Sequence, residues 1–433
     1  MDKTLDFDAK YYLEKYPEVA AAGLDPYEHY LEHGIPEGRH PNAADEPHFT
    51  SAEARHLRAP ARSPLRVVTG ETVRRLTLLV DEIAVDSEHP DVIAAVALAA
   101  QWARRTGREL RVVTRRTPAD AATLAAVFAE TRISLLATSE LVHVPWDGGD
   151  PLSVGDDDLF LATTWQNTEA VLGSIPARQV AYLISEDERA LTALGADTLA
   201  ATAVMNHPGL AVAVATTSLY EHLIRAGAEN LAQTGQAFEP SAATFATDGR
   251  VCAVPDTSRN LVIETSPLSY RLTDLALAAV DLAIERGYLA AGRWQIHLTG
   301  RDAPGIRLLD DTSPARLGIL DWPAYRNLLA TADLGLSLTA SARPDYATNA
   351  LAASGAFVVT NTWPGKPDLT TELNRVIMAV PNASALADAI GAAVARIEAE
   401  GQEPYTPQGT CLSPWPVVLY DVVEHLAKAR GDV

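Results

Sequence analysis

Short, continuous runs of apolar residues alternate with amphipathic helical stretches along most of this chain. The strands predicted from the apolar runs of the first half are 76–80, 110–114, 133–136, 159–163, 180–184 and 210–215. The helices predicted between them include 92–105, 118–130 and one that opens near Trp165. Because a strand that is apolar at successive positions is buried on both faces, the pattern predicts a parallel sheet with helices on both sides.

The same alternation starts again after a break at residues 239–259, which hold Pro240, Gly249 and Pro255 among small polar residues. The strands predicted beyond the break are 261–263, 294–298, 316–320, 334–338 and 356–360. The helices predicted there are 272–286, 322–330, 348–353, 383–399 and 415–429. Two alternating halves predict two doubly wound domains that face each other across a cleft, with ligands at the carboxyl ends of the strands.

The first 45 residues predict a small helical module instead. Asp8 suits the N-cap of a helix, and Gly23 suits a C-cap. Asp25 and Pro26 fit the N-cap and first position of a further helix, which Gly34 ends. Residues 46–66 are polar and contain several prolines, so they predict a linker.

Composition narrows the function further. The chain has 433 residues with 47% hydrophobic content, which is enough for two to three folded domains. The net charge of −21 disfavours nucleic-acid binding, and an anionic substrate must be met by a local cluster of Arg or by helix N-termini. The two cysteines, Cys252 and Cys411, provide neither a disulfide framework nor a metal site and fit a reducing cytosol. With no signal peptide and no run of about 20 apolar residues, we expect a cytoplasmic protein without a membrane span.

Residues 341–361, SARPDYATNALAASGAFVVTN, carry the most informative pattern. A short helix leads into Ser354-Gly355, a buried strand follows, and Asn361 closes it. This arrangement resembles the donor-sugar half of a two-domain glycosyltransferase. The stretch from Phe7 to Asn42 is similar to a helical module joined to bacterial glycosyltransferases of polysaccharide assembly.

The rest of the chain resembles, in collinear order, the rhamnosyltransferases of surface-layer and cell-wall glycan assembly, a retaining branch with the GT-B fold. The segments that carry this resemblance are LTLLVDEI, RELRVVTRR, DDDLFLATTW, ARQVAYLI, NHPGLAVAVATTS, LDWPAYRNLLATADLGLSL and ALAASGAFVVTN. The resemblance implies two Rossmann-like domains, an acceptor-side domain at 67–250 and a donor-side domain at 251–410, with a helix at 411–433 that returns to the first. It also implies a nucleotide-sugar donor, with dTDP-rhamnose as the first candidate, and a saccharide acceptor. It implies no requirement for a metal or another cofactor.

Candidate site residues follow from strand ends, helix starts and this resemblance. Arg271 lies at the start of a predicted helix, where an anion would meet both its charge and the helix dipole. The candidate donor-binding residues are Arg271, Gly300, Arg301, Asp345, Tyr346, Asn349, Ser354, Gly355 and Asn361. The candidate acceptor-side residues are Thr164, Trp165, Glu186 and His207. Each has a plain structural alternative, such as a surface Arg, a helix cap, a turn or a loop histidine, and no catalytic residue is assigned.

The sequence departs from the family at the donor side. The positions of two family glutamates are occupied by Ala342 and Ala350, and each lost charge-assisted hydrogen bond costs on the order of 1.5–3 kcal/mol. A family Gly-Gly turn reads His89-Pro90-Asp91, which removes an N–H and adds a negative charge beside the expected diphosphate. Thr348 and Asn349 are the polar groups left on the turn before Ser354 that could replace the missing glutamate, and the structural alternative for Thr348 is a helix N-cap.

Two functions therefore stay open. The first is a hexosyltransferase of bacterial surface-glycan assembly. The second is a catalytically inactive relative that acts as a binding or scaffolding subunit, with a glycosyltransferase or a second copy of the chain as partner. The sequence contains no GxSxG, Walker, zinc-type or Gly-rich dinucleotide motif, so hydrolase, NTPase and NAD-enzyme functions have little support.

Overall fold

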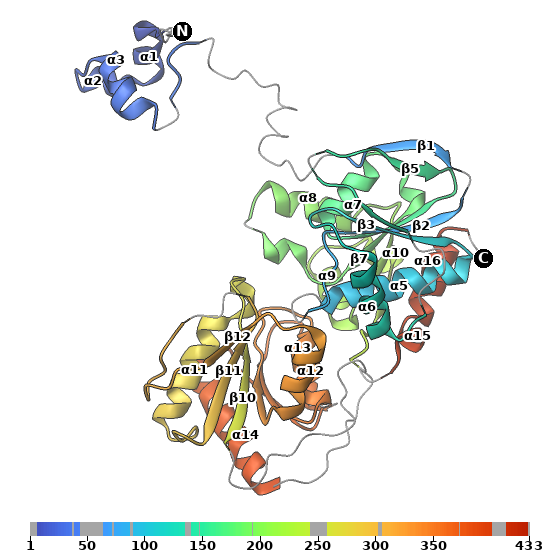
Figure 1. Cartoon of the computed structure of the whole chain (residues 1–433), viewed down its shortest axis with the longest axis vertical. Helices are drawn as coiled ribbons and strands as arrows, with labels where there is room; N and C mark the ends of the chain where they lie inside the picture. Colours follow the sequence, from blue (N-terminus) through green and yellow to red (C-terminus); the bar gives the residue numbers. More distant parts are fainter. Residues whose placement is uncertain are drawn as a thin grey trace. The chain divides into compact units, whose positions relative to one another are not determined.

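The computed structural model describes residues 7–36, 39–43, 64–71, 73–86, 90–134, 140–146, 148–192, 194–242, 258–301, 305–371, 373–400 and 413–431 (Figure 1). The chain forms two compact units, Met1–Pro60 and Ala61–Val433. Most of the predicted linker at 46–66, both cysteines and His89 lie outside the described residues.

The first unit is a small helical module with an aromatic core. Its helices are α1 (Ala9–Lys15), α2 (Pro17–Ala21), α3 (Pro26–His29) and a π-helical turn, η1 (Tyr30–Gly34). The carboxylate of Asp8 accepts hydrogen bonds from two backbone N–H groups of α1, and Asp25 does the same for α3, as the sequence predicts. Tyr12, Val19 and Tyr30 form the buried core of this unit.

The first sheet of the second unit has seven parallel strands in the order β4-β3-β2-β6-β7-β8-β9. Its strands are β2 (Arg75–Val80), β3 (Glu109–Thr114), β4 (Glu140–His143), β6 (Leu159–Thr163), β7 (Val180–Ile184), β8 (Ala211–Ala215) and β9 (Gly235–Phe238). A separate parallel pair is formed by β1 (Val67–Glu71) and β5 (Leu152–Gly155). The connecting helices are α5 (Pro90–Thr106), α6 (Ala121–Thr131), α7 (Trp165–Leu172), η3 (Ala177–Gln179), η4 (Glu188–Leu191), α8 (Ala196–Met205), α9 (Thr217–Arg225) and α10 (Leu231–Thr234).

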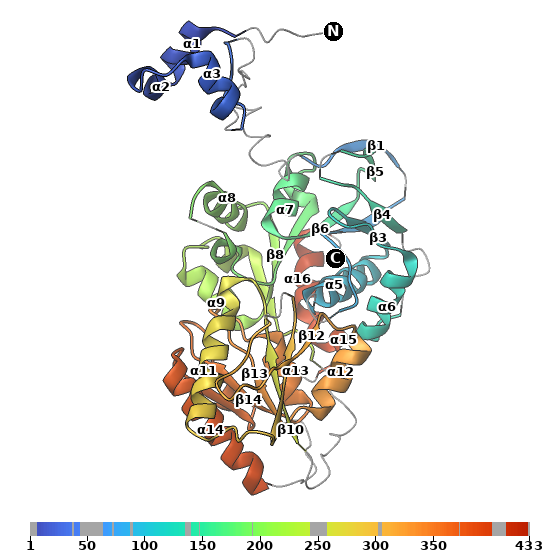
Figure 2. The same cartoon turned by 60° about the vertical axis from the view of Figure 1, so that its left-hand side comes forward.

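The second sheet has six parallel strands in the order β12-β11-β10-β13-β14-β15, which is the 3-2-1-4-5-6 order of a Rossmann domain. Its strands are β10 (Arg259–Glu264), β11 (Trp294–Thr299), β12 (Ala315–Gly318), β13 (Leu334–Leu336), β14 (Phe357–Asn361) and β15 (Val376–Ala379). Its helices are η5 (Ser269–Arg271), α11 (Thr273–Glu285), α12 (Trp322–Thr331), α13 (Tyr346–Ala353), η6 (Leu369–Thr371) and α14 (Ala383–Glu400). Helices α11 and α14 pack together against one face of the sheet, and α12 and α13 cover the other (Figure 2).

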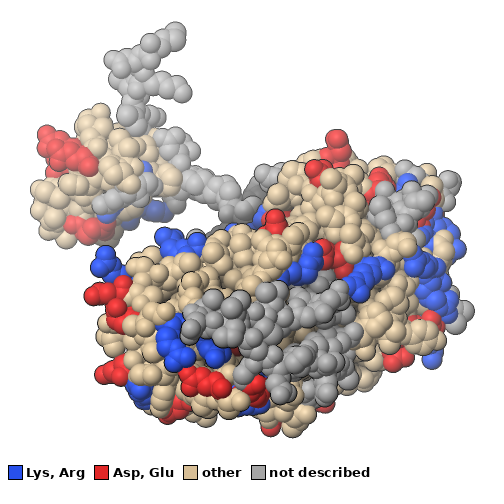
Figure 3. All heavy atoms as spheres, turned by 60° about the horizontal axis from the view of Figure 1, so that its bottom comes forward, with Lys and Arg blue, Asp and Glu red and all other residues tan. Residues whose placement is uncertain are grey.

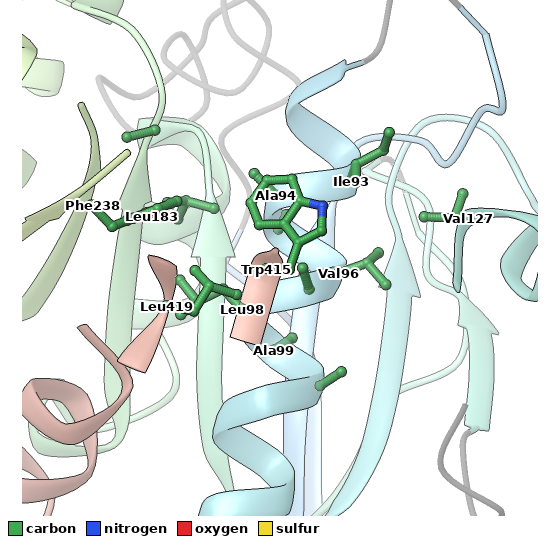
Figure 4. Packing of buried hydrophobic residues seen from close by; sticks show 14 of the residues in the cluster. Ile93, Ala94, Val96, Leu98, Ala99, Val127, Leu183, Phe238, Trp415 and Leu419 are labelled. Atoms are coloured by element: carbon green, nitrogen blue, oxygen red, sulfur yellow. The ribbon is translucent and has the colours of Figure 1, made fainter. Parts of the chain in front are cut away.

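The chain ends on the first sheet. Helices α15 (Trp415–Val418) and α16 (Tyr420–Ala429) follow one another, and α16 contacts α5, β8 and β9. The buried side chain of Trp415 packs beside Ala94 and Val96 of α5 (Figure 4). At the far end, Arg430 donates hydrogen bonds to the backbone carbonyls of Ala177, Gly209 and Val180. This segment therefore ties the carboxyl end of the chain to the first sheet.

Four sequence expectations need correction. Helix α13 begins at Tyr346 with Asp345 in the N-cap position, so the N-cap assigned to Thr348 is wrong. The predicted helix 415–429 is interrupted at Leu419, and β13 ends at Leu336. A strand was predicted at 133–136. Residues 133 and 134 are not in a strand, and residues 135 and 136 lie outside the described residues. The strand that pairs with β3 at this edge is β4.

Among the helices that the structure describes, none is long and apolar enough to cross a membrane. On the face shown in Figure 3, Lys and Arg side chains are interspersed with Asp and Glu side chains over the described part of the surface.

Candidate functional site

A cavity of about 410 Å³ lies where strands of both sheets end. Glu82 and Arg116 line it from the loops after β2 and β3, and Asp91 lines it from the start of α5. The second sheet contributes the loop after β10 and the end of β11, which carries Gly300 and Arg301. The cavity therefore occupies the carboxyl edges of two doubly wound sheets, the position at which such folds bind ligands.

Three arginines, Arg116, Arg271 and Arg301, line this first cavity. The Arg271 guanidinium donates from Nη1 to Asp345 Oδ1 at 2.5 Å. Burial would lower the pKa of Arg271, but the charge of Asp345 outweighs it and the pKa rises well above its ordinary value. The Arg116 Nη2 atom lies 3.3 Å from Asp81 Oδ2. Arg301 is exposed. The cavity is therefore lined by cationic side chains, but a bound anion would have to compete with Asp345 for the Arg271 guanidinium.

Asp345 is the anion at the centre of this arrangement. Its Oδ2 accepts a hydrogen bond of 2.6 Å from the Ser337 hydroxyl. Burial would raise the pKa of Asp345, but the charge of Arg271 and these hydrogen bonds lower it. Asp345 is therefore a carboxylate at neutral pH, and it lies at the N-terminus of α13, where the helix dipole favours negative charge.

Gly300, in the wall of the first cavity, lies close against the backbone of Thr265. It has a φ of +110°, and a Cβ at this position would lie 2.1 Å from the carbonyl oxygen of Thr265. No L-residue with a side chain fits here without moving the β10 loop. Glycine is therefore required by the geometry of the cavity wall.

A second cavity, of about 360 Å³, lies beside the start of α9. Tyr346 and Asn349 of α13 line it, and the Tyr346 hydroxyl donates to the Ser241 carbonyl at 3.1 Å. The other lining residues are Thr216, Thr217, Ser218, Glu221, Glu239, Pro240, Arg343, Pro344, Pro367, Asp368, Leu369 and Leu373. Two of the sequence candidates therefore face this cavity rather than the first.

Between the two cavities, the loop before α13 is fastened to the first sheet's domain. Arg343 Nη2 donates to Asp91 Oδ1 at 2.6 Å, and Nη1 donates to the Ser185 carbonyl. The Ser341 hydroxyl donates to Glu186 Oε1 at 2.7 Å. Burial alone would lower the pKa of Arg343, but the charges of Asp91 and Glu186 outweigh it and raise the pKa. The space left here is a cavity of only about 30 Å³.

Comparisons with known proteins agree with this architecture. Residues 267–391 match the family described as WsaF, C-terminal domain. The structure of HepE from Anabaena in complex with UDP-glucose matches with a TM-score of 0.52 and 12% identity, covering 83% of this chain and 100% of that chain. Sucrose-phosphate synthase from Thermosynechococcus elongatus matches with a TM-score of 0.50 and 12% identity, covering 83% and 94%. No curated protein sequence matches significantly.

The chain has the GT-B fold. The predicted fold class is thereby confirmed. Six of the nine predicted donor-side residues line one of the three described cavities, and all six belong to the second sheet's domain. These residues are Arg271, Gly300, Arg301, Asp345, Tyr346 and Asn349.

The remaining donor-side candidates lie elsewhere in the GT-B domain. Ser354 and Gly355 are at the far end of α13, where Gly355 has a φ of +91° and ends the helix. Asn361 is fully buried, and its side-chain amide exchanges hydrogen bonds with the backbone of Thr339 at 2.8 and 3.0 Å. None of these three lines a described cavity, and the bonds from Asn361 to Thr339 hold the loop that leads to Arg343.

The acceptor-side candidates are also divided. Glu186 lines the small cavity, and burial raises its pKa although Arg343 and Ser341 oppose the shift. Thr164 caps α7 with a φ of +64°, which is unusual for a β-branched residue. Trp165 is buried in the core, and His207 precedes β8 and so lies at the opposite edge of the sheet from the cavities.

The two alanines that replace family glutamates are enclosed. Ala350 is fully buried within α13, and Ala342 is 3% exposed. A Cβ on Gly365 would lie 3.1 Å from Ala342 Cβ and 3.2 Å from His222 Nδ1, so these residues already fill the space between the domains. Neither alanine position opens into a described cavity.

Sequence reasoning missed Arg343. It took Asp91 as an uncompensated charge beside a diphosphate, whereas Asp91 is paired with Arg343. The signal available was a cationic residue in a loop between two buried elements, directly before the start of α13. In the described part of the chain, no group of three or more His, Cys, Asp or Glu side chains is placed to hold a metal ion.

Proposed function

We propose that this protein is a glycosyltransferase that moves a hexose from a nucleotide sugar to a saccharide acceptor in bacterial surface-glycan assembly. Rhamnose is the first candidate sugar, dTDP the first candidate nucleotide, and the cytoplasm the expected compartment. The observation that carries the proposal is the first cavity, which combines Arg116, Arg271 and Arg301 with the close backbone approach at Gly300. The match of residues 267–391 to the WsaF C-terminal domain falls on the same half of the chain.

The chemistry of this cavity suits a diphosphate leaving group. Negative charge develops on the diphosphate as the sugar departs, and arginines stabilise such charge through paired N–H donors. Arg271 would exchange Asp345 for a phosphate oxygen, so that Asp345 would be released towards the sugar. HepE, which shares the fold, was crystallised with UDP-glucose, and this supports a nucleotide sugar as the ligand class here.

A second candidate function is a catalytically inactive subunit that keeps the fold. The specific observations in its favour are the enclosed Ala342 and Ala350, and the 2.5 Å contact that already occupies Arg271. The cavity of about 30 Å³ between the domains leaves little room for a sugar in this arrangement. Such a subunit would act through a glycosyltransferase partner or a second copy of this chain.

A donor-turnover assay tests the proposal. The full chain is incubated with dTDP-rhamnose, UDP-glucose or GDP-mannose, and release of the nucleoside diphosphate is followed by chromatography. We expect release from one donor, reduced at least about tenfold in Arg271→Gln because one charge-assisted contact is lost. Donor binding without release from any of the three would favour the inactive subunit instead.

A further inference from the structure

The second cavity differs from the first in the charge and in the apolar character of the side chains that line it. Its inner wall is made of buried side chains, of which Tyr346, Leu369 and Leu373 are between 5% and 8% exposed. Its outer wall carries the exposed carboxylates of Glu221 and Glu239. A volume of about 360 Å³ is within the range of small-molecule sites. A ligand would therefore meet an apolar inner wall and an acidic rim.

The charges of this cavity disfavour a phosphate. Three carboxylates line it, and the one cationic side chain among its described lining residues, Arg343, is held by Asp91 and the Ser185 carbonyl. A nucleotide or sugar phosphate would bring negative charge beside Glu221, Glu239 and Asp368, and no other Arg or Lys among the described lining residues would compensate it. The first cavity, by contrast, is lined by three arginines beside its four carboxylates, Glu82, Asp91, Glu264 and Asp345.

The polar groups of the second cavity suit a ligand with many hydroxyls. Carboxylates accept strong hydrogen bonds from hydroxyl groups, and the Asn349 amide offers both a donor and an acceptor. The Asn349 side chain is half-buried and makes no hydrogen bond to another described residue. The ring of Tyr346 and the neighbouring leucines offer a surface for the C–H faces of a sugar ring.

A third cavity of about 30 Å³, on the order of two water molecules, shares Asp91 and Arg271 with the first cavity and Arg343 and Tyr346 with the second. A sugar ring does not fit in this small space, so a saccharide in the second cavity would not extend through it into the first.

We propose that the second cavity is a binding site for a neutral saccharide, occupied independently of any nucleotide. The saccharide site itself does not require the proposed function. Its role as the acceptor site rests on the proposed function, since only a transferase has an acceptor.

Saturation-transfer NMR on the full chain, without nucleotide, tests this site. The probes are L-rhamnose, D-glucose, N-acetyl-D-glucosamine and glucose 6-phosphate, each at about 10 mM because a single sugar binds weakly. We expect saturation transfer to at least one of the neutral sugars and none to glucose 6-phosphate. Dissociation constants should rise about three- to tenfold in Glu221→Gln, which replaces a charge-assisted hydrogen bond by a neutral one, and in Asn349→Ala, which removes a side-chain donor and acceptor.

Controls separate this site from the first cavity. Arg301→Gln should leave sugar binding unchanged, and thermal melting checks that the Glu221 and Asn349 variants stay folded. The proposal is wrong if none of the neutral sugars binds, if glucose 6-phosphate binds equally well, or if added dTDP displaces the sugar. A failure of donor turnover leaves the saccharide result unaffected, so the two proposals fail separately.

Discussion

The contact between Asp91 and Arg343 joins the two Rossmann-like domains, and its removal should cost measurable stability. Breaking a buried ion pair by deleting one partner costs about 3–5 kcal/mol. Here the Asp91 side chain is 43% exposed while that of Arg343 is 8% exposed, so water screens one partner. Glu186 also attracts Arg343 and compensates part of a lost Asp91 charge. We therefore expect a coupling energy of about 1–2 kcal/mol between the two side chains.

A double-mutant cycle with Asp91→Asn and Arg343→Met measures this energy. Unfolding in urea is followed by tryptophan fluorescence, which reports the second unit alone because all 7 tryptophans of the chain lie within residues 61–433. The free energy of unfolding is measured for the wild type, both single variants and the double variant.

A matched control pair lies on the surface of the second sheet's domain. Arg286 and Asp388 are 2.6 Å apart with side chains 31% and 61% exposed, so their coupling should stay below about 1 kcal/mol. A coupling between Asp91 and Arg343 within about 0.5 kcal/mol of zero would show that the domains are not held together through this pair.

Two further perturbations have clear expected results. Gly300→Ala should lower the melting temperature and weaken nucleoside diphosphate binding, because the added Cβ would lie 2.1 Å from the Thr265 carbonyl oxygen. Unchanged melting and titration curves would show that the loop after β10 moves to accept the Cβ without cost. Glu188, whose carboxylate oxygen accepts from Trp165 N at 2.6 Å, has a pKa raised by burial from 4.5 to about 8. The folded protein therefore keeps a proton that the unfolded chain loses, so the stability from this group is present below pH 4.5 and is lost as the pH rises to about 8. Glu188→Gln should flatten that dependence in urea unfolding measured from pH 5 to 9, and an unchanged slope would contradict the buried, protonated carboxyl.

Most central strands of the two sheets could be predicted from the sequence because they are continuous apolar runs. β6 and β7 have the predicted bounds. α14 ends one residue later than predicted, and α5 begins two residues earlier and ends one residue later than predicted. The short strands β4, β9 and β15 were missed, since they are only 4 residues long and carry polar or half-exposed positions. An edge strand has one partner, so its sequence is less constrained to be apolar.

The site was predictable where a residue follows directly from a strand end or a helix start. Arg271, Gly300, Arg301 and Asp345 belong to this class, and all four line the first cavity. Pairings across the domains were not predictable, because Arg343 and Asp91 are 252 positions apart and meet only once both domains have folded. His207 was wrongly predicted to lie at the site, because it precedes β8 rather than following a strand. Trp165 was wrongly predicted to line the site, because its ring is buried in the core.

Calorimetric titration of the full chain with dTDP, UDP and GDP tests the central claim most directly. The account predicts micromolar binding of one of these diphosphates in the first cavity, weakened about tenfold in Arg271→Gln and in Arg301→Gln. Flat titrations with all three nucleotides would contradict a donor site at this position and would favour an inactive subunit that acts through a protein partner.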